Sequence, residues 1–188
     1  MNALASTPVG AYINEHFVAT FVKVGTFTVA NGNKQGGNVA SYFCLHDGTV
    51  LHAIAGPVNA ETFLREARWA VETRKLALFH ANGHGKTYQT ALLRSHAERL
   101  TNEYGIPVDN LYRAWSTNIN LRMHSTFDSF ALMHGGQRHH GGKDAGGNLA
   151  RMHLLLYGSP GVKVERIYQY VFEKVLNEKI STLPVVQK

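Results

Sequence analysis

The sequence contains only one cysteine, Cys44, in 188 residues. A single cysteine cannot form an intramolecular disulfide, and no CxxC pair is present to carry dithiol chemistry. Because Cys44 stands in an apolar, strand-like stretch, we expect a small buried side chain, with a reactive thiol as the alternative. No apolar run approaches the roughly 18 residues that a membrane helix needs, so a membrane location is not expected.

The N-terminal stretch MNALASTPVGAYINEHF lacks the basic and apolar regions of a secretory signal peptide, so we expect a cytoplasmic location. The formal net charge of +6 reflects 19 Lys and Arg against 13 Asp and Glu. These cations are scattered along the chain, which argues against a nucleic-acid partner. Hydrophobic residues make up 44% of the chain, enough to form a buried core.

The N-terminal part of the chain shows helix and strand patterns in turn. Apolar spacing over residues 9–17 predicts a short helix, and Pro8 suits its first turn. The β-branched residues 18–24 predict a buried strand. Residues 25–38 are dense in Gly and Asn and predict mostly loop, with room for one short strand.

A hairpin followed by a long helix is the strongest local pattern. Residues 39–45 and 50–55 predict two strands, and Gly48 after an aspartate suits the tight turn between them. Asn59 is a good N-cap for an amphipathic helix that extends to about residue 78. The charged residues of this helix fall on the face opposite its apolar stripe, where solvent is expected: Glu61, Arg65, Glu66, Arg68, Glu72 and Lys75.

Beyond the composition change at residues 80–85, the patterns are helical. Residues 86–104 predict a helix that Gly105 ends, with core-spaced positions at Ala91, Leu92, Leu93, His96, Leu100 and Tyr104. Residues 162–180 predict another helix, and residues 152–157 form a short apolar run. We therefore predict two parts, an α/β part over residues 1–78 and a helical extension over residues 79–188.

Two stretches of the first part resemble a thioredoxin-like domain. VASYFCLHDGTVLHAIAGPVNAETFLREARWAVE is similar to the antiparallel hairpin and closing helix of that family. VGAYINEHFVATFVKV resembles the end of its first long helix and the strand that follows. The resemblance spans about residues 9–78 and implies an α/β fold: an incomplete thioredoxin-like sheet with a mostly helical C-terminal region.

The chain departs from that family where the family carries its chemistry. The CxxC motif would lie before residue 9, and no proline stands near Ala40, where the family has its cis-proline. The expected function is therefore a redox-inactive, thioredoxin-like binding or scaffolding protein with a protein partner, no cofactor and no catalytic residues. The alternative is a thiol-disulfide oxidoreductase whose CxxC segment is missing from this chain.

The 11 histidines include several that stand close together in sequence. His80 and His84 are four residues apart, a spacing that can serve one metal ion on a helix. Others cluster in the C-terminal half: His134, His139, His140 and His153. We take His80, His84, His134, His139 and His140 as candidate metal ligands, although no HExxH motif or paired cysteines accompany them. A metal-binding protein is thus a second alternative function.

Residues 135–148, GGQRHHGGKDAGGN, form a long Gly-rich segment. Unhindered backbone N–H groups beside basic side chains can bind a phosphate or another anion. Arg138, His139, His140 and Lys143 are therefore a candidate anion or ligand site. The alternative is a solvated loop without a ligand, because loops of this length are either functional or disordered.

Overall fold

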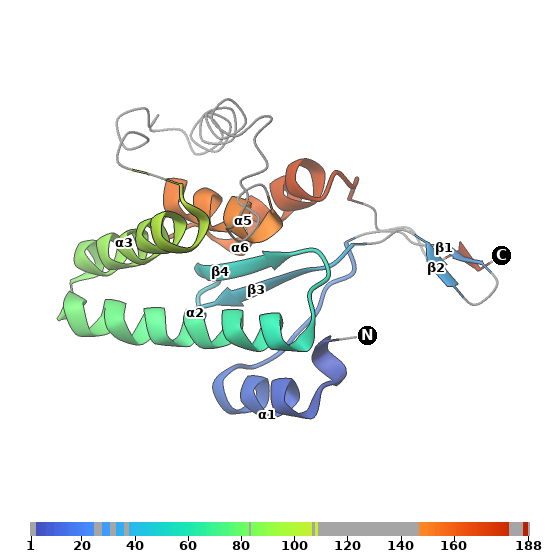
Figure 1. Ribbon diagram of the computed structural model, residues 1–188, viewed down its shortest axis with the longest axis horizontal. Coiled ribbons are helices and arrows are strands. Elements are labelled where there is room, and N and C mark those ends of the chain that lie inside the picture. The colour runs from blue at the N-terminus through green and yellow to red at the C-terminus, as the bar shows by residue number, and fades with distance from the viewer. Residues whose placement is uncertain are drawn as a thin grey trace.

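The computed structural model shows a mixed α/β protein that is mostly helical, built around a two-stranded antiparallel sheet (Figure 1). This confirms the coarser part of the fold prediction, the α/β class. The structure describes residues 3–24, 28–30, 33–35, 38–82, 84–106, 108, 147–180 and 186–187. Among these residues, no helix is long and apolar enough to cross a membrane.

The chain begins with a 3-10 turn, η1 (Ala3–Ala5), and the helix α1 (Thr7–His16), with Pro8 in its first turn as predicted. The strand predicted for residues 18–24 is wrong, because this stretch is neither helix nor strand. Val18 and Phe21 are almost fully exposed. β-branched residues form a strand only where another strand pairs with them, and no described strand pairs with this stretch.

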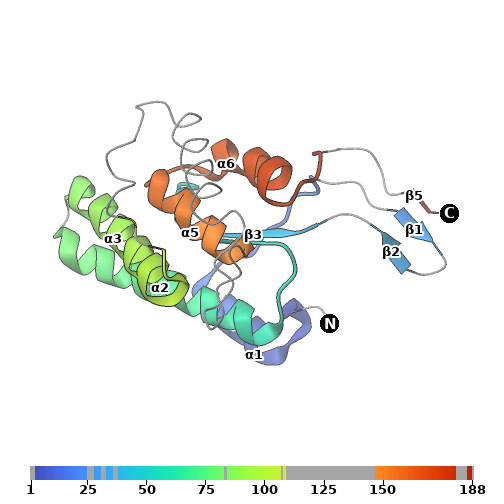
Figure 2. The ribbon, with the colours of Figure 1, turned by 45° about the horizontal axis from the view of Figure 1, so that its top comes forward.

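Two strands of a small sheet lie within the stretch predicted as mostly loop. The sheet joins β1 (Thr28–Ala30) to β2 (Asn33–Gln35) in antiparallel pairing and to β5 (Val186–Gln187) in parallel pairing. This sheet lies beside the C-terminal end of the chain, away from the central hairpin (Figure 2). It therefore contributes nothing to the region described below as the candidate site.

The predicted hairpin is confirmed as β3 (Ala40–Cys44) and β4 (Val50–Ala55). Gly48 has φ +79°, the left-handed conformation that the turn requires. The pairing is irregular at one point, since Cys44 faces Val50 whereas Phe43 faces His52. Leu51 is therefore an extra residue on β4, a β-bulge that leaves its backbone outside the regular ladder.

Two long helices follow with the predicted caps. α2 (Ala60–Ala81) begins after Asn59, whose side chain accepts a hydrogen bond from the Thr62 backbone N–H at 2.8 Å. α3 (Gly85–Tyr104) ends at Gly105, which has φ +66°. Such signals are local, and this explains why sequence reasoning placed both helices to within a few residues.

The C-terminal helices differ more from the prediction. α5 (Asn148–Gly158) is a full helix where the sequence indicated only a short apolar run. Its first residue, Asn148, belongs to the predicted Gly-rich loop, but it opens this helix and its side-chain amide donates to the Ala55 carbonyl at 3.1 Å. The helix predicted over residues 162–180 is shorter, comprising α6 (Val164–Tyr170) and a π-helical turn, η3 (Val171–Val175).

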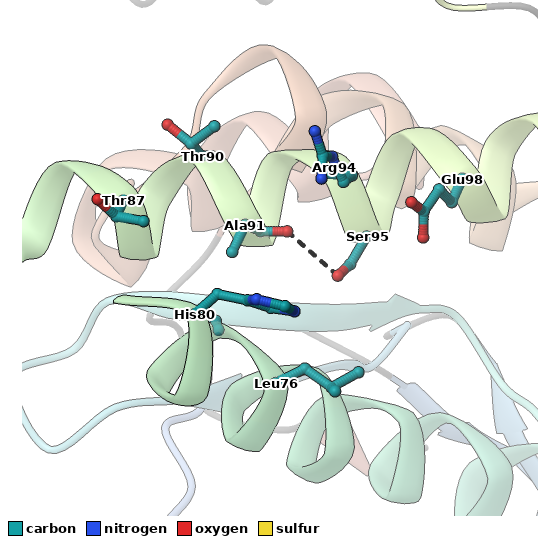
Figure 3. A pocket seen from close by; sticks show the side chains of 9 residues that line it. Leu76, His80, Thr87, Thr90, Ala91, Arg94, Ser95 and Glu98 are labelled. Atoms are coloured by element: carbon teal, nitrogen blue, oxygen red, sulfur yellow. Dashed lines mark hydrogen bonds between the residues drawn. The ribbon is translucent and has the colours of Figure 1, made fainter. Parts of the chain in front are cut away.

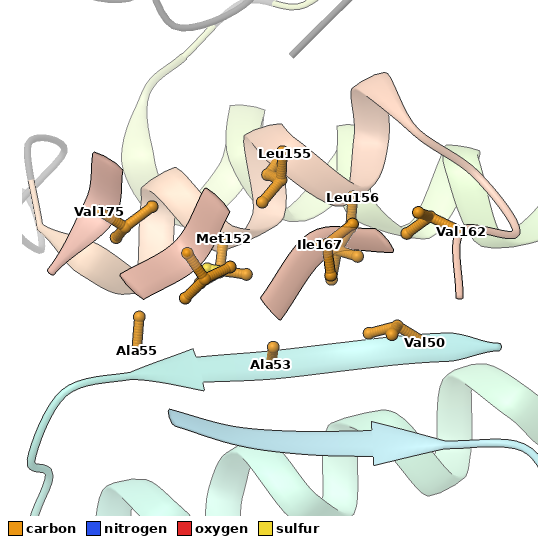
Figure 4. Close-up of a cluster of buried hydrophobic side chains, with 10 residues drawn as sticks. Val50, Ala53, Ala55, Met152, Leu155, Leu156, Val162, Ile167 and Val175 are labelled. Atoms are coloured by element: carbon orange, nitrogen blue, oxygen red, sulfur yellow. The ribbon is translucent and has the colours of Figure 1, made fainter. Parts of the chain in front are cut away.

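The hairpin lies between two helical layers, with α2 on one face and α5 and α6 on the other (Figures 1 and 2). Every residue of β4 is buried as a result. On the α5 side, Val50, Ala53 and Ala55 pack against a cluster completed by Met152, Leu155, Leu156, Val162, Ile167, Val171 and Val175 (Figure 4). On the α2 side, Ile54 packs with Phe63 and Ala67.

The division predicted at residue 78 falls within the last turns of α2. Side chains from both predicted parts share the core, because Met152 and Leu155 pack against β4. α3 also joins the two parts, since Leu92 packs with Leu51 and Ala77. The division into two parts stays a sequence-based prediction.

Candidate functional site

Three histidines from three different elements meet in the interior. His52 lies on β4, His96 on α3 and His153 on α5. One ring nitrogen from each lies within 4.8 Å of the other two. None of the three side chains reaches solvent, because His52 and His153 are 0% exposed and His96 is 2% exposed.

The local backbone explains how the histidines meet. At the β-bulge, the Leu51 carbonyl lies outside the regular β3–β4 ladder. It accepts a hydrogen bond from His96 Nε2 at 3.1 Å. His52, the next residue, points to the α2 side of the hairpin and bonds Glu66 through Nε2 at 2.9 Å. His153 closes the cluster from α5, with its Nδ1 atom 2.9 Å from His96 Nδ1.

Glu66 is the only carboxylate in contact with this cluster among the described residues. Its Oε1 atom accepts hydrogen bonds from Arg99 at 2.7 Å and from Arg65 at 3.0 Å. Its Oε2 atom faces His52 and lies 4.0 Å from His153 Nε2. The sequence pattern placed Glu66 on the exposed face of its helix; this was wrong, because Arg99 from α3 supplies a buried partner for its charge.

Arg99 is buried beside Glu66 and links it to Glu103, near the C-terminal end of α3. Its Nε atom donates to Glu103 one helical turn later at 3.0 Å. Its guanidinium carbon lies 5.0 Å from the centre of the Trp69 ring, a cation–π distance. His96 and Arg99 are three residues apart, as are Glu66 and Trp69, so each helix presents two site residues on one face.

Trp69 packs edge-on against all three imidazoles. Its ring centre lies 4.9 Å from those of His52 and His153, and 5.0 Å from that of His96. His52 and His153 stack at 4.6 Å. This aromatic surround keeps water from the imidazoles and limits their rotation, so the ring nitrogens are held in fixed directions.

Burial keeps the histidines neutral. Desolvation lowers the pKa of His96 to about 3, although its bond to the Leu51 carbonyl acts in the opposite direction. Burial also lowers the pKa of His52, and that of His153 falls well below its usual range. Burial alone raises the pKa of Glu66, but the hydrogen bond from His52 and the charge of Arg99 outweigh it and lower that pKa to about 2. The site therefore holds three neutral imidazoles beside one carboxylate.

Two of the ring nitrogens have no hydrogen-bond partner among the described residues: His52 Nδ1 and His153 Nε2. A buried polar atom without a partner is costly and calls for a physical explanation. Neutral imidazoles whose outer nitrogens bond to a carboxylate or a backbone carbonyl are the arrangement by which proteins orient histidine ligands toward a metal ion. The cluster has the ligand type, number and spacing for such an ion.

The predicted metal ligands do not include the histidines of this cluster. His80 and His84 are exposed, His80 in the last turn of α2 and His84 just before α3. His80 lines a pocket of about 440 Å³ between these helices, where its ring and Leu76 face Ala91 and Ser95 (Figure 3). The other candidates lie outside the described residues: His134, Arg138, His139, His140 and Lys143.

Cys44, the candidate reactive thiol, is partly buried at the end of β3. Burial raises the pKa of its thiol to about 11, and the charges of Glu165 and Asp47 act in the same direction. A thiol with such a pKa is almost entirely protonated at neutral pH and is a poor nucleophile.

The sequence did carry one signal for the cluster. His52 interrupts an otherwise apolar strand, and His96 and His153 each stand among apolar residues of a helix pattern. Three such positions on separate elements can be buried together only if each finds a partner. Their meeting in space depends on long-range packing, which no local pattern reveals.

No known protein family, no curated protein and no solved structure matches this chain. Functional assignment therefore depends on the geometry of the site.

Proposed function

We propose that this protein binds one transition-metal ion through His52, His96 and His153. The observation that carries the proposal is the convergence of three buried, neutral imidazoles, with one nitrogen of each within 4.8 Å of the others. In a tetrahedral site, bonds of about 2.1 Å place ligand nitrogens roughly 3.4 Å apart. The 2.9 Å between His96 Nδ1 and His153 Nδ1 is close to that value, so small side-chain shifts suffice.

The ligand set favours a particular class of metal. Imidazole nitrogen suits Zn²⁺, Cu²⁺, Fe²⁺ and Ni²⁺, whereas Ca²⁺ and Mg²⁺ require oxygen ligands. Three protein ligands also leave at least one coordination position for water or another small molecule, as in catalytic zinc sites. The nearby Glu66 carboxylate offsets part of the added charge, although Arg99 and Arg65 already share it.

The test is metal analysis of protein purified without a His tag, followed by titration of the metal-free protein with Zn²⁺. We expect one ion per chain, and we expect His96→Gln to remove it. His80→Gln is the matched control, because His80 is exposed and far along α2 from the cluster. Binding that survives His96→Gln undiminished would contradict the proposal.

The loop histidines require a control of their own, because they were predicted as metal ligands. A chain with His134, His139 and His140 all changed to Asn should keep its stoichiometric ion. Loss of the ion from this variant, together with retention in His96→Gln, would move the site to residues 134–140 and support the metal-binding alternative that the sequence predicts.

We also propose, on a separate observation, that the thioredoxin-like part is redox-inactive and serves as a binding or scaffolding module for a protein partner. The supporting observation is Cys44, a lone thiol whose pKa is raised to about 11. The β3–β4 hairpin followed by α2 is consistent with the predicted resemblance. An insulin-reduction assay should give no activity; reduction that Cys44→Ser abolishes would instead favour the oxidoreductase alternative.

A further inference from the structure

The hydrogen bonds of the cluster fix which nitrogen of each histidine carries the proton. Arg99 and Arg65 both donate hydrogen bonds to Glu66, as they do to a carboxylate, which can only accept; His52 must therefore donate through Nε2–H. The Leu51 carbonyl also only accepts, so His96 donates through Nε2–H. Since both rings are neutral, the Nδ1 atoms of His52 and His96 carry lone pairs.

His153 must then have the opposite tautomer. Two bare nitrogens would repel each other at 2.9 Å, so His153 Nδ1–H donates to the lone pair of His96 Nδ1. This leaves His153 Nε2 bare. It has no partner among the described residues and lies 4.0 Å from Glu66 Oε2, an acceptor that repels a lone pair.

We infer that His153 changes from the Nδ1–H tautomer to the Nε2–H tautomer when a metal ion binds. Glu66 is the positioning residue, because its Oε2 atom accepts a hydrogen bond from the new Nε2–H group. This inference rests on the proposed metal-binding function. The ion takes the Nδ1 lone pairs of His96 and His153, so the proton leaves His153 Nδ1. It is carried instead on His153 Nε2, which then donates toward Glu66 Oε2. The ring stays neutral throughout, and no proton is released to solvent.

The two carboxylate oxygens of Glu66 contact different partners. Oε1 is held by Arg99 and Arg65, and Arg99 is in turn anchored by Glu103. Oε2 is left for the histidines. Glu66 therefore holds His52 in the ligand-competent tautomer before an ion arrives and stabilises His153 in that tautomer afterwards. Outer carboxylates of this kind typically contribute roughly 10- to 100-fold to metal affinity.

The direct test is ¹⁵N NMR of the imidazole rings, with and without one equivalent of Zn²⁺. Without metal, we expect Nε2–H tautomers for His52 and His96 and the Nδ1–H tautomer for His153. With Zn²⁺, we expect all three to be Nε2–H. A metal-free His153 that already carries Nε2–H, or a zinc-bound His153 that keeps Nδ1–H, overturns the inference.

The same spectra separate this inference from the proposed function. If Zn²⁺ leaves all three rings unchanged, the metal-binding proposal fails and the tautomer exchange fails with it. If Zn²⁺ binds while His153 keeps Nδ1–H, the proposed function stands and only the exchange is overturned.

A variant tests the part assigned to Glu66. Glu66→Gln should weaken Zn²⁺ binding by roughly 10- to 100-fold and should mix the tautomers of His52, which a purely structural role would not change. Glu72→Gln is the matched control on the exposed side of α2, where Glu72 pairs with Lys75. If Glu66→Gln does not fold, Arg99→Met is added to remove the unpaired buried charge. Unchanged affinity with a single His52 tautomer would overturn the role of Glu66.

Discussion

His96 and His153 face each other through their Nδ1 atoms at 2.9 Å, and this contact joins α3 to α5 inside the protein. Neither imidazole reaches solvent, and each lies about 5 Å from the same tryptophan, Trp69. Such a contact between two neutral rings requires one Nδ1–H to donate to the lone pair of the other Nδ1, and the accepting ring then carries its own proton on Nε2. We expect this contact in the core to make the stability of the protein sensitive to acid, and the proposed metal ion would bind here.

Acid should destabilise the protein at a pH where most carboxylates are still ionised. The folded protein holds His52, His96 and His153 neutral with lowered pKa values, whereas in the unfolded chain each titrates near 6.5. Below pH 6.5 the unfolded state therefore binds more protons, and stability falls as the pH falls. Each histidine contributes up to about 1.4 kcal/mol per pH unit, so the three together approach roughly 4 kcal/mol per unit.

Urea unfolding at pH 7, 6 and 5 measures this dependence without the metal. Glu66 adds to it only in stronger acid, because its pKa of about 2 lies below the usual 4.5 and its stabilisation is lost between those values. A free energy of unfolding that is flat from pH 7 to 5 would contradict a neutral buried cluster.

Zinc binding at pH 6.5 should release no protons. The three cluster histidines are already neutral in the folded protein, so the ion displaces none. Exposed histidines are about half protonated at this pH, and a site built from three of them would release roughly 1.5 protons per ion. Titration calorimetry in buffers of different ionisation enthalpy gives the number directly, and equal heats in all buffers are expected. Heats that rise with the buffer enthalpy would point to the exposed histidines.

Leu155→Ala tests how firmly α5, and His153 with it, is held against β4. Leu155 is fully buried in the cluster with Val50 and Ala53, so its truncation should cost roughly 2–5 kcal/mol of unfolding free energy. Leu76→Ala is the control, because Leu76 is 54% exposed on α2 and should change stability by less than about 0.5 kcal/mol. Similar losses from both substitutions, measured in urea, would show that the α5 layer does not pack as described.

The elements that the sequence predicted well are those with local signals. Gly48 in the hairpin turn, Asn59 before α2 and Gly105 after α3 each act through their own backbone neighbourhood. Residues 18–24 show the limit of this reasoning. Their β-branched composition predicted a strand, but strand formation needs a pairing partner, and pairing is decided by the rest of the fold.

The candidate site was missed for the same reason. Helix periodicity assigned Glu66 to the solvent face because it stands among charged residues, and nothing near it in sequence reveals Arg99. His153 stood closest in sequence to His134, His139 and His140, yet it meets His52 and His96, more than 50 residues away. Histidines that interrupt apolar strands and helices were the sequence signal for this cluster, whereas the prediction on the histidines of the Gly-rich loop lies outside the described residues.

The reactivity of the Cys44 thiol tests the proposal that the protein is redox-inactive. With its pKa at about 11, roughly one thiol in a thousand is ionised at pH 8, whereas about a quarter of ordinary thiols are. Because alkylation by iodoacetamide requires the thiolate, we expect the native protein to react on the order of 100-fold more slowly than the same protein in urea. Intact-mass measurement over time follows the reaction, and Cys44→Ser gives the background. Equal rates in buffer and in urea would show an accessible, ordinary thiol and reopen the oxidoreductase alternative.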